Sequence, residues 1–293
     1  MSNATMHVGV DVGGTRLRVI AQGGDERRTQ IHEVAVPHTV PDIVDALARL
    51  IEKATAGRRV ARTAVGLPGE TTAAVPRWVP NLRFLDGAPL ASLISTRVGG
   101  ECILVNDAQA TLVAEAHEGA AVGASSVVLV AVGTGIGGAL MLDGRLVRGA
   151  HGCAGAFGWL SFPGGTADPD HGAWEQAASG MALAEKARPW TDVASLIAAA
   201  RAGEREARQV MELFGTQLGT GVAALASTFD PEVVVLAGGL VVSLDVIEAS
   251  LLAAQRAHAS PAGRTVPIVA AALGPHAGVI GALLVALNTE EIA

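Results

Sequence analysis

Two glycine-rich segments, placed at matching points in the two halves of the chain, constrain its fold most strongly. They read Asp11-Val12-Gly13-Gly14-Thr15 and Gly133-Thr134-Gly135-Ile136-Gly137-Gly138. Each lies between two apolar runs typical of strands, which cover residues 7–10 and 17–21 in the first case and 127–132 and 139–142 in the second. The pattern predicts two glycine-turned β-hairpins, one in each of two similar domains.

Both glycine segments are candidate phosphate-binding loops. Glycine has no side chain, so backbone amides can approach phosphate oxygens closely, and the hydroxyls of Thr15 and Thr134 add donors. Neither segment is a Walker motif or a dinucleotide fingerprint, since the lysine of the former and the helix-opening GxGxxG of the latter are missing. One such hairpin alone could be a structural turn. Two of them, the first preceded by Asp11, favour a nucleotide bound between the two domains.

Two further segments add to this interpretation through their order in the chain. Asp107 follows an expected strand over residues 102–105 and opens an expected helix that reaches Glu118. One interpretation is that Asp107 has no role beyond that of N-cap of this helix. Set between two phosphate loops, it becomes a candidate general base. The turn Gly238-Gly239 follows an apolar strand, and it is either an ordinary strand-to-helix connection or a place where an adenine ring lies flat on the backbone.

The remaining pattern predicts an α/β chain. Further strands are expected over residues 31–36, 63–66, 233–237 and 266–270. Helices are expected over residues 43–54, 174–187, 192–202, 204–228, 245–258 and 277–287.

In these features the chain resembles the ROK family, which comprises sugar kinases and sugar-responsive repressors built on the actin-like ATPase fold. The resemblance covers nearly the whole chain and is carried by short motifs in a fixed order. They are Asp11 to Arg16, Gly66-Leu67-Pro68-Gly69, Pro80-Asn81-Leu82, Asn106-Asp107-Ala108 with Glu115, Gly133 to Gly138, Asp143-Gly144-Arg145, Arg148-Gly149-Ala150, Asp230 to Gly239 and Leu273 to Ala282.

The resemblance implies an α/β fold of the two-domain actin-like ATPase (ribonuclease H-like) type with a central cleft. Residues 6–106 would form a small N-terminal α/β domain, completed by a C-terminal helix over residues 277–288. Residues 107–276 would form a large C-terminal α/β domain, with the cleft near Asn106.

It also implies the roles of individual residues. Asp11 would hold Mg²⁺ through water, Asp107 would remove the proton from a sugar hydroxyl group, and Asn106 would help to hold the sugar. The expected ATP-binding residues are Asp11, Gly13, Gly14, Thr15, Arg16, Gly133, Thr134, Gly135, Gly137, Gly238 and Gly239. The expected substrate-binding residues are Gly69, Asn81, Asn106, Asp107, Ala156, Trp159 and Glu175.

Two segments depart from the family pattern. Where the family usually has Gly-Glu-Ile-Gly-His, the chain has Gly155-Ala156-Phe157-Gly158-Trp159, so the carboxylate and the imidazole that usually hold the sugar are absent. Trp159 would offer the ring an apolar platform instead. Residues 165–175 contain none of the cysteines of the family's zinc segment and keep only Glu175. Because structural zinc needs about four Cys or His ligands, we expect no structural zinc.

Composition fits a soluble, cytoplasmic enzyme, which we expect to be a homodimer. A chain of 293 residues, 50% of them hydrophobic, can form two cores. The net charge of −7 gives no electrostatic reason to bind nucleic acid. No apolar run reaches the ~20 residues of a membrane span, and the presence of only Cys102 and Cys153 argues against a disulfide.

The sequence therefore favours ATP-dependent phosphorylation of a primary hydroxyl group on a hexose or hexose-like ring, with a pocket altered from that of a glucokinase. Two alternatives stay open: a kinase for a C7-cyclitol or a modified sugar of secondary metabolism, and a non-catalytic sugar-binding ROK protein. A repressor is disfavoured, because the first phosphate strand begins at His7 and leaves no room for an N-terminal helix-turn-helix domain.

Overall fold

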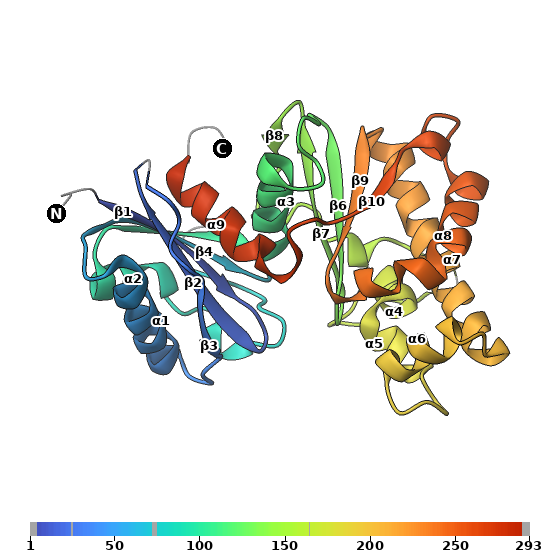
Figure 1. Ribbon diagram of the computed structural model, residues 1–293, viewed down its shortest axis with the longest axis horizontal. Helices are drawn as coiled ribbons and strands as arrows, with labels where there is room; N and C mark the ends of the chain where they lie inside the picture. Colours follow the sequence, from blue (N-terminus) through green and yellow to red (C-terminus); the bar gives the residue numbers. More distant parts are fainter. Residues whose placement is uncertain (1–4, 25, 72–74, 164, 289–293) are drawn as a thin grey trace. The chain divides into compact units, whose positions relative to one another are not determined.

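The computed structural model describes residues 5–24, 26–71, 75–163 and 165–288. The chain divides into two compact units. Unit 1 comprises residues 1–122, 145–154 and 275–293, and unit 2 comprises residues 123–144 and 155–274. The described residues form two five-stranded sheets, with helices packed against each (Figure 1).

The first sheet lies in unit 1 and consists of strands β1 to β5. Their bounds are Met6–Val12, Arg16–Gly23, His32–Ala35, Val60–Leu67 and Glu101–Asn106. The order across the sheet is β3-β2-β1-β4-β5. β1 and β2 form an antiparallel hairpin, whereas β4 runs parallel to β1 and β5 runs parallel to β4.

Helices cover both faces of this sheet. Successive residues of a strand point to opposite faces, so Met6 and Val8 enter a core shared with α1 (Val40–Thr55) and α2 (Leu90–Val98). Gly9 faces the other side, where α9 (Ala277–Leu287) packs against β1 and against α3 (Asp107–Glu118). A side chain at Gly9 would collide with the backbone of α9, so this glycine permits the close contact.

Local sequence accounts for the bounds of α1. The hydroxyl of Thr39 accepts a hydrogen bond from the amide of Asp42 at 3.3 Å, which caps the first turn. Pro41 lies in that turn, where its missing amide costs no helical hydrogen bond. The apolar residues predicted at helical spacing are buried, and the helix ends at Thr55, followed by the C-cap Ala56 in a left-handed conformation.

The second sheet repeats the arrangement of the first. Strands β6 to β10 span Val127–Val132, Ile136–Leu142, Arg145–Leu146, Val233–Ala237 and Ile268–Ala270, in the order β10-β9-β6-β7-β8. β6 and β7 form an antiparallel hairpin, while β9 is parallel to β6 and β10 is parallel to β9. Strands β7-β6-β9-β10 thus match β2-β1-β4-β5 in order and direction, as expected for two similar domains.

Unit 2 contains the remaining helices. They are α4 (Ala173–Ala178), α5 (Gly180–Glu185), α6 (Val193–Arg201), α7 (Arg205–Phe229) and α8 (Leu244–His258). α7 and α8 pack closely because Gly215 and Gly219 leave room for the backbone of α8. Even α7, with 25 residues, lacks the apolar length of a membrane span, and the same holds for every other helix in the described ranges.

The predicted mixture of strands and helices is confirmed, with one helix corrected. The helix expected over residues 174–187 is divided at Ser179 into α4 and α5. Ser179 caps α5 by accepting a hydrogen bond from the amide of Ala182 at 3.2 Å. The amide of Gly180 donates outside the helix, to the carbonyl of Gly133 at 2.8 Å. The short elements α2 and β8 were not predicted.

The compact units also differ in extent from the predicted domains. α3 and residues 145–154 belong to unit 1, although the sequence analysis assigned residues 107–276 to the second domain. α3 packs tightly against α9, because Gly281 lies directly on the carbonyl of Ala110. The side chain of Gln109 holds residues 148–154 against the same helix.

Candidate active site

In the first glycine hairpin, the acidic side chain of Asp11 lies opposite the positively charged side chain of Arg18. Asp11 is 9% exposed and pairs in register with Arg18 on β2. Nη1 of Arg18 donates to Oδ2 of Asp11 at 3.0 Å. The turn is closed by the amide of Gly13, which donates to the carbonyl of Arg16 at 3.0 Å. The amides of Gly14 and Thr15 find no acceptor among the described residues, so they are available to a ligand.

The surroundings of Asp11 have two opposing effects on its pKa. Burial raises the pKa of the carboxyl group, while the hydrogen bond and positive charge of Arg18 lower it, and burial has the larger effect. Gly278, at the start of α9, lies against the same carboxyl group. A Cβ atom added there would be 3.2 Å from Oδ1 of Asp11. The acid is therefore enclosed by β2 on one side and by the C-terminal helix on the other.

The junction of β5 and α3 presents Asp107. Asn106 is the N-cap of α3, because its side-chain oxygen accepts from the amides of Ala108 at 3.0 Å and Gln109 at 3.3 Å. Its Nδ2 donates to the carbonyl of Gly69 at 3.2 Å. Oδ1 of Asp107 also accepts from the amide of Ala108, at 2.8 Å. Asp107 is therefore not the residue that caps the helix, which removes the structural role considered for it.

The pKa of Asp107 is raised above that of an ordinary aspartate. The residue keeps some exposed surface, yet burial of its carboxyl group, followed by the negative charge of Asp11, raises the pKa to about 6. Hydrogen bonds from backbone amides oppose this shift but do not cancel it. The influence of Asp11 shows that the two carboxyl groups lie within electrostatic reach of each other inside unit 1.

Gln109 is a site residue that the sequence analysis missed. It is fully buried, and its Nε2 lies within hydrogen-bond distance of the carbonyls of Arg148, Gly152 and Ala154, at 3.2–3.3 Å. It thereby ties residues 148–154 to the first turn of α3, two residues after Asp107. The sequence shows only a polar residue on a helix. The burial that gives Gln109 this role depends on residues about forty positions away.

The other predicted sugar residues of unit 1 lie in the loops that surround this junction. Gly69 has a φ of +94° and packs on the backbone of Trp78, where no side chain would fit. Asn81 has a φ of +64°, and its Cβ would lie 3.8 Å from a Cβ added at Gly14. Asn81 is thus beside the first hairpin, and Gly69 is beside Asn106.

Hydrogen bonds with α4 and α5 hold the second glycine hairpin. The carbonyls of Gly133 and Thr134 accept from the amides of Gly180 and Met181 at 2.8 and 3.0 Å. Oε2 of Glu175 accepts from the amide of Ile136 at 2.7 Å. Burial raises the pKa of Glu175 and this hydrogen bond lowers it, the first effect being larger. In the described chain the amides of Thr134 and Gly135 have no acceptor, as at the first hairpin.

The segment that departs from the family's sugar motif lies in unit 2. Phe157 is buried against Gly138, whereas Ala156 is exposed and Trp159 is 41% exposed. The two positions that lack the family's carboxylate and imidazole therefore both reach the surface of this unit. Glu175, also a predicted substrate-binding residue, accepts a hydrogen bond from the hairpin backbone.

Gly238 and Gly239 adjoin an apolar cavity in unit 2. Gly238 has a φ of +92°, and a side chain there would collide with the backbone of Val132 at the end of β6. The cavity is lined by Val132, Leu218, Leu236, Ala237, Leu240, Val241, Leu244 and Ile247. With a volume of about 10 Å³, the cavity has room for about one water molecule and not for an adenine ring.

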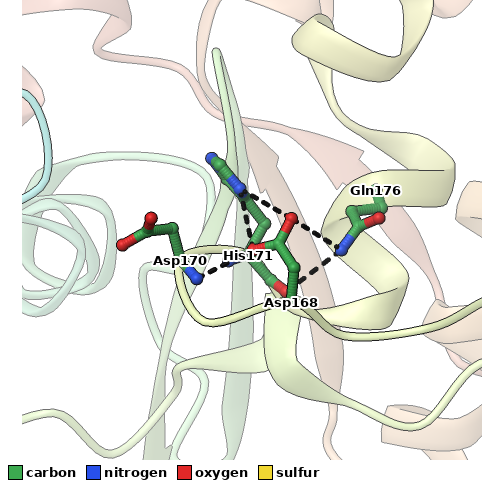
Figure 2. A network of polar contacts seen from close by, with 4 residues as sticks. All are labelled: Asp168, Asp170, His171 and Gln176. Carbon is green, nitrogen blue, oxygen red and sulfur yellow. Dashed lines mark hydrogen bonds and ion pairs between the residues drawn. The ribbon is translucent and has the colours of Figure 1, made fainter.

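Asp168 organises the segment that lacks the expected zinc ligands. Its carboxylate accepts from the amides of Asp170 and His171 at 2.8 and 2.7 Å, and it contacts Nδ1 of His171 (Figure 2). Nε2 of Gln176 donates to the carbonyl of His171 at 3.2 Å. These contacts fix the turn that leads into α4 and so into Glu175. Over the described residues no three His, Cys, Asp or Glu side chains gather as metal ligands.

Comparison with known proteins gives one consistent result. The ROK family profile matches residues 7–289. A glucokinase of Streptomyces coelicolor is 29% identical, over 97% of this chain and 98% of that protein. A ROK hexokinase of Thermus thermophilus has a TM-score of 0.84 and 31% identity, covering 97% of this chain and 99% of its own. A ROK glucokinase of Streptomyces griseus, solved with glucose and AMPPNP, has a TM-score of 0.81 and 29% identity over 97% and 99% of the two chains.

The two sheets and their helices therefore form an α/β structure of the actin-like ATPase class, as predicted. Within that class, the chain belongs to the ROK family.

Proposed function

We propose that the chain is an ATP-dependent kinase that phosphorylates a primary hydroxyl group of a hexose or hexose-like ring. Asp107 carries the proposal. Asn106 caps the helix, so the carboxylate of Asp107 is left for chemistry, and its pKa is raised to about 6. A general base works best with a pKa near the working pH. The glucokinase and hexokinase relatives support the same class of reaction.

In the proposed reaction, Asp107 accepts the proton of the attacking hydroxyl group. The hydroxyl oxygen bonds to the γ-phosphorus of ATP, and the bond to the β–γ bridging oxygen breaks with its electron pair leaving on ADP. Asn106 and residues 148–154, held by Gln109, shape the surroundings of the base. Such a base contributes about 10²- to 10⁴-fold in rate.

Backbone amides of both hairpins would bind the phosphates. Those of Gly14 and Thr15 in unit 1 and of Thr134 and Gly135 in unit 2 have no acceptor within the described chain. Adenine would lie on the backbone at Gly238 and Gly239, where a Cβ added at Gly239 meets no described atom within 4 Å. AMPPNP in the Streptomyces griseus relative supports ATP as the phosphoryl donor.

The carboxylate of Asp11 fits a Mg²⁺ site. Magnesium in kinases is held by one or two carboxylates together with water and substrate phosphates rather than by an all-protein cage. A single buried acid next to a phosphate loop, with a second acid in electrostatic reach, meets that requirement. When bound, the ion neutralises charge on the phosphates.

The substrate is proposed to differ from glucose. With Ala156 and Trp159 in place of a carboxylate and an imidazole, glucose bound in the family manner would leave hydroxyl groups unpaired. Each unpaired buried polar group costs roughly 1–3 kcal/mol. A C7-cyclitol or a modified hexose that is altered at those positions would avoid this cost, and the exposed face of Trp159 would pack against its ring.

Sugar-dependent release of ADP tests the proposal. A coupled assay would compare glucose, mannose, N-acetylhexosamines and a C7-cyclitol with a reaction that contains no acceptor, and ³¹P and ¹³C NMR would locate the new phosphate ester. We expect one ring to raise ADP release well above the acceptor-free rate and to carry phosphate on its primary oxygen. Binding of a ring by calorimetry without any gain in ADP release would support the non-catalytic alternative.

Structural zinc is proposed to be absent. Asp168, His171 and Gln176 already fix the relevant turn by hydrogen bonds. Metal analysis of protein purified without chelators should find far less than one zinc per chain. A stoichiometric zinc content would instead require His151 or His171 to join nearby carboxylates as ligands.

A further inference from the structure

Arg18 makes a contact that the proposed reaction does not use. It lies directly across the first hairpin from Asp11, and the two side chains form an ion pair at 3.0 Å. The side chain of Arg18 is 19% exposed and that of Asp11, taken without its backbone, is 12% exposed. Charge-assisted hydrogen bonds of this kind are stronger than ion pairs on the open surface, where water and salt screen the charges.

Arg16 provides an internal comparison. Both arginines approach Glu33 on β3, Arg16 at 3.2 Å and Arg18 at 3.3 Å. Arg16 and Glu33 are 53% and 43% exposed. Of the two arginines, Arg18 is the one with an ion pair to Asp11 in the described structure. The two side chains thus share a surface partner and differ in their contact with the buried acid.

The contact bears on the binding of a cation at Asp11. Oδ2 of the carboxylate already accepts from a guanidinium group, and Gly278 lies beside Oδ1. A divalent ion with its water shell must share this carboxylate with a fixed positive charge. The negative phosphates of a nucleotide offset that repulsion, so the arginine opposes the free ion more than the ion bound to a nucleotide.

We propose that Arg18 is a positioning residue that occupies Asp11 in the nucleotide-free protein, weakens the binding of free divalent cations, and thereby makes the metal enter together with the nucleotide phosphates. The inference rests on the proposed role of Asp11. It requires reciprocal coupling between metal and nucleotide, because each ligand changes the affinity for the other by the same factor.

Manganese binding to the nucleotide-free protein tests this inference without any measurement of turnover. Free Mn²⁺ would be followed by EPR for the wild type and for Arg18→Gln, and the titration would be repeated with saturating ADP. In the substituted protein, free Mn²⁺ should bind about tenfold more tightly, the size of effect expected for loss of one partly buried charge contact. In the presence of ADP, the gain in affinity should be smaller, because the phosphates already offset the charge of Arg18.

Three variants isolate the contact with Asp11. Arg16→Gln removes an exposed ion pair with Glu33 and keeps the pair between Arg18 and Asp11, so it should leave the affinity for free Mn²⁺ unchanged. Because Arg16 is also an expected ATP-binding residue, this control is measured on the nucleotide-free protein. Arg18→Lys, which keeps a positive charge, should restore weak binding. Asp11→Asn combined with Arg18→Gln should lose the added affinity. Arg18→Met keeps the aliphatic stem and replaces Arg18→Gln if circular dichroism shows that the latter is unfolded.

Equal affinities of the wild type and Arg18→Gln for free Mn²⁺ would overturn the inference, as would an added affinity that survives Asp11→Asn. Either result is separate from a failure of the proposed function, which appears as absence of sugar-dependent ADP release by the wild type.

Discussion

The two glycine hairpins occupy the same position in sheets of matching strand order, yet different charged side chains surround them. The β1–β2 hairpin holds Asp11 and Arg18 face to face, and Asp107 lies within electrostatic reach in the same unit. The strands β6 and β7 contain no charged residue. The acid that serves their hairpin comes from α4, where Glu175 accepts from the backbone amide of Ile136.

This difference shows what a repeated strand order does and does not determine. The order places a turn with unoccupied amides at the same end of both sheets. It does not determine which side chains surround the turn. In unit 1 the charged side chains are those for which we propose metal and proton chemistry, whereas in unit 2 the side chain of Glu175 accepts a hydrogen bond from the backbone of the turn.

The largest expected effect belongs to the proposed base. Asp107→Asn keeps the shape of the side chain but cannot accept a proton, so kcat should fall by about 10²-fold or more. Binding of ATP and of the sugar, measured by calorimetry, should change little. Turnover within about tenfold of the wild type would contradict the assignment. Asp107 lies near Asn106 and Gln109, so circular dichroism is needed to show that α3 is intact.

Adding polar groups at positions 156 and 159 of unit 2, which we propose to face the substrate, should change specificity. In Ala156→Glu/Trp159→His, two polar partners return to positions that are now exposed. The ratio of kcat/KM for glucose to that for the best ring should rise by about tenfold or more, since each paired polar group is worth about 1–3 kcal/mol. The matched variant Ala156→Gln/Trp159→Phe adds no carboxylate or imidazole and should give a smaller change. An unchanged ratio would place the specificity elsewhere.

Glu175 distinguishes a loop support from a substrate ligand. Glu175→Gln weakens the hydrogen bond to Ile136, so the KM for ATP should rise by about tenfold while the KM for the sugar stays nearly constant. Glu185→Gln, which alters an exposed carboxylate of α5, is the control and should leave both constants unchanged. A rise confined to the KM for the sugar would instead support the substrate-binding role expected from the sequence.

The pH dependence of activity tests the proposed base in unit 1. The base must be ionised to act, and burial with the charge of Asp11 raises the pKa of Asp107 to about 6. Below that pH, kcat/KM should decline by about tenfold per unit. A profile that stays flat down to pH 5 would argue against a tuned base in unit 1.

The same shift affects stability with a defined sign. The native protein holds its proton on Asp107 at higher pH than the unfolded chain, so this contribution to the free energy of unfolding is present below the ordinary aspartate pKa and is lost as pH rises to about 6. Asp107→Asn, which cannot ionise, should therefore be more stable than the wild type at pH 7, by at most about 3 kcal/mol, with the gain vanishing near pH 4. Chemical denaturation at the two pH values measures it.

Sequence reasoning was most successful where local pattern decides structure. Glycine turns between apolar runs predicted both hairpins, and the apolar spacing of residues 43–54 predicted α1. It could not show that Asn106 rather than Asp107 caps α3, since both residue types are suitable caps. Nor could it predict that Ser179 interrupts a helix, because the interruption depends on the carbonyl of Gly133 far away in the chain.

Within the site, the missing information concerns partners brought together by the fold. The pairing of Arg18 with Asp11 follows from the register of β1 and β2, which a one-residue shift would abolish. The contacts of Gln109 with residues 148–154 and of Glu175 with Ile136 join segments about forty residues apart. Single-residue chemistry identified candidates such as Asp107, but only packing shows which side chains support the others.

The smallest expected effect tests how tightly Asp11 is enclosed. In Gly278→Ala, the new Cβ would lie 3.2 Å from Oδ1 of Asp11, closer than an ordinary van der Waals contact, so the carboxylate must shift by a few tenths of an ångström. The affinity for Mn²⁺ in the presence of ADP should fall by about two- to threefold, because a small displacement weakens an ion contact without abolishing it. Gly133→Ala is the counterpart in the second hairpin, where a Cβ meets no other described atom within 4 Å. That variant should leave the affinity for free Mn²⁺ unchanged. Only its affinity for ATP should fall, since the new methyl group lies at the backbone that would bind phosphate. Equal losses of Mn²⁺ affinity in both variants would contradict the division of chemistry between the hairpins.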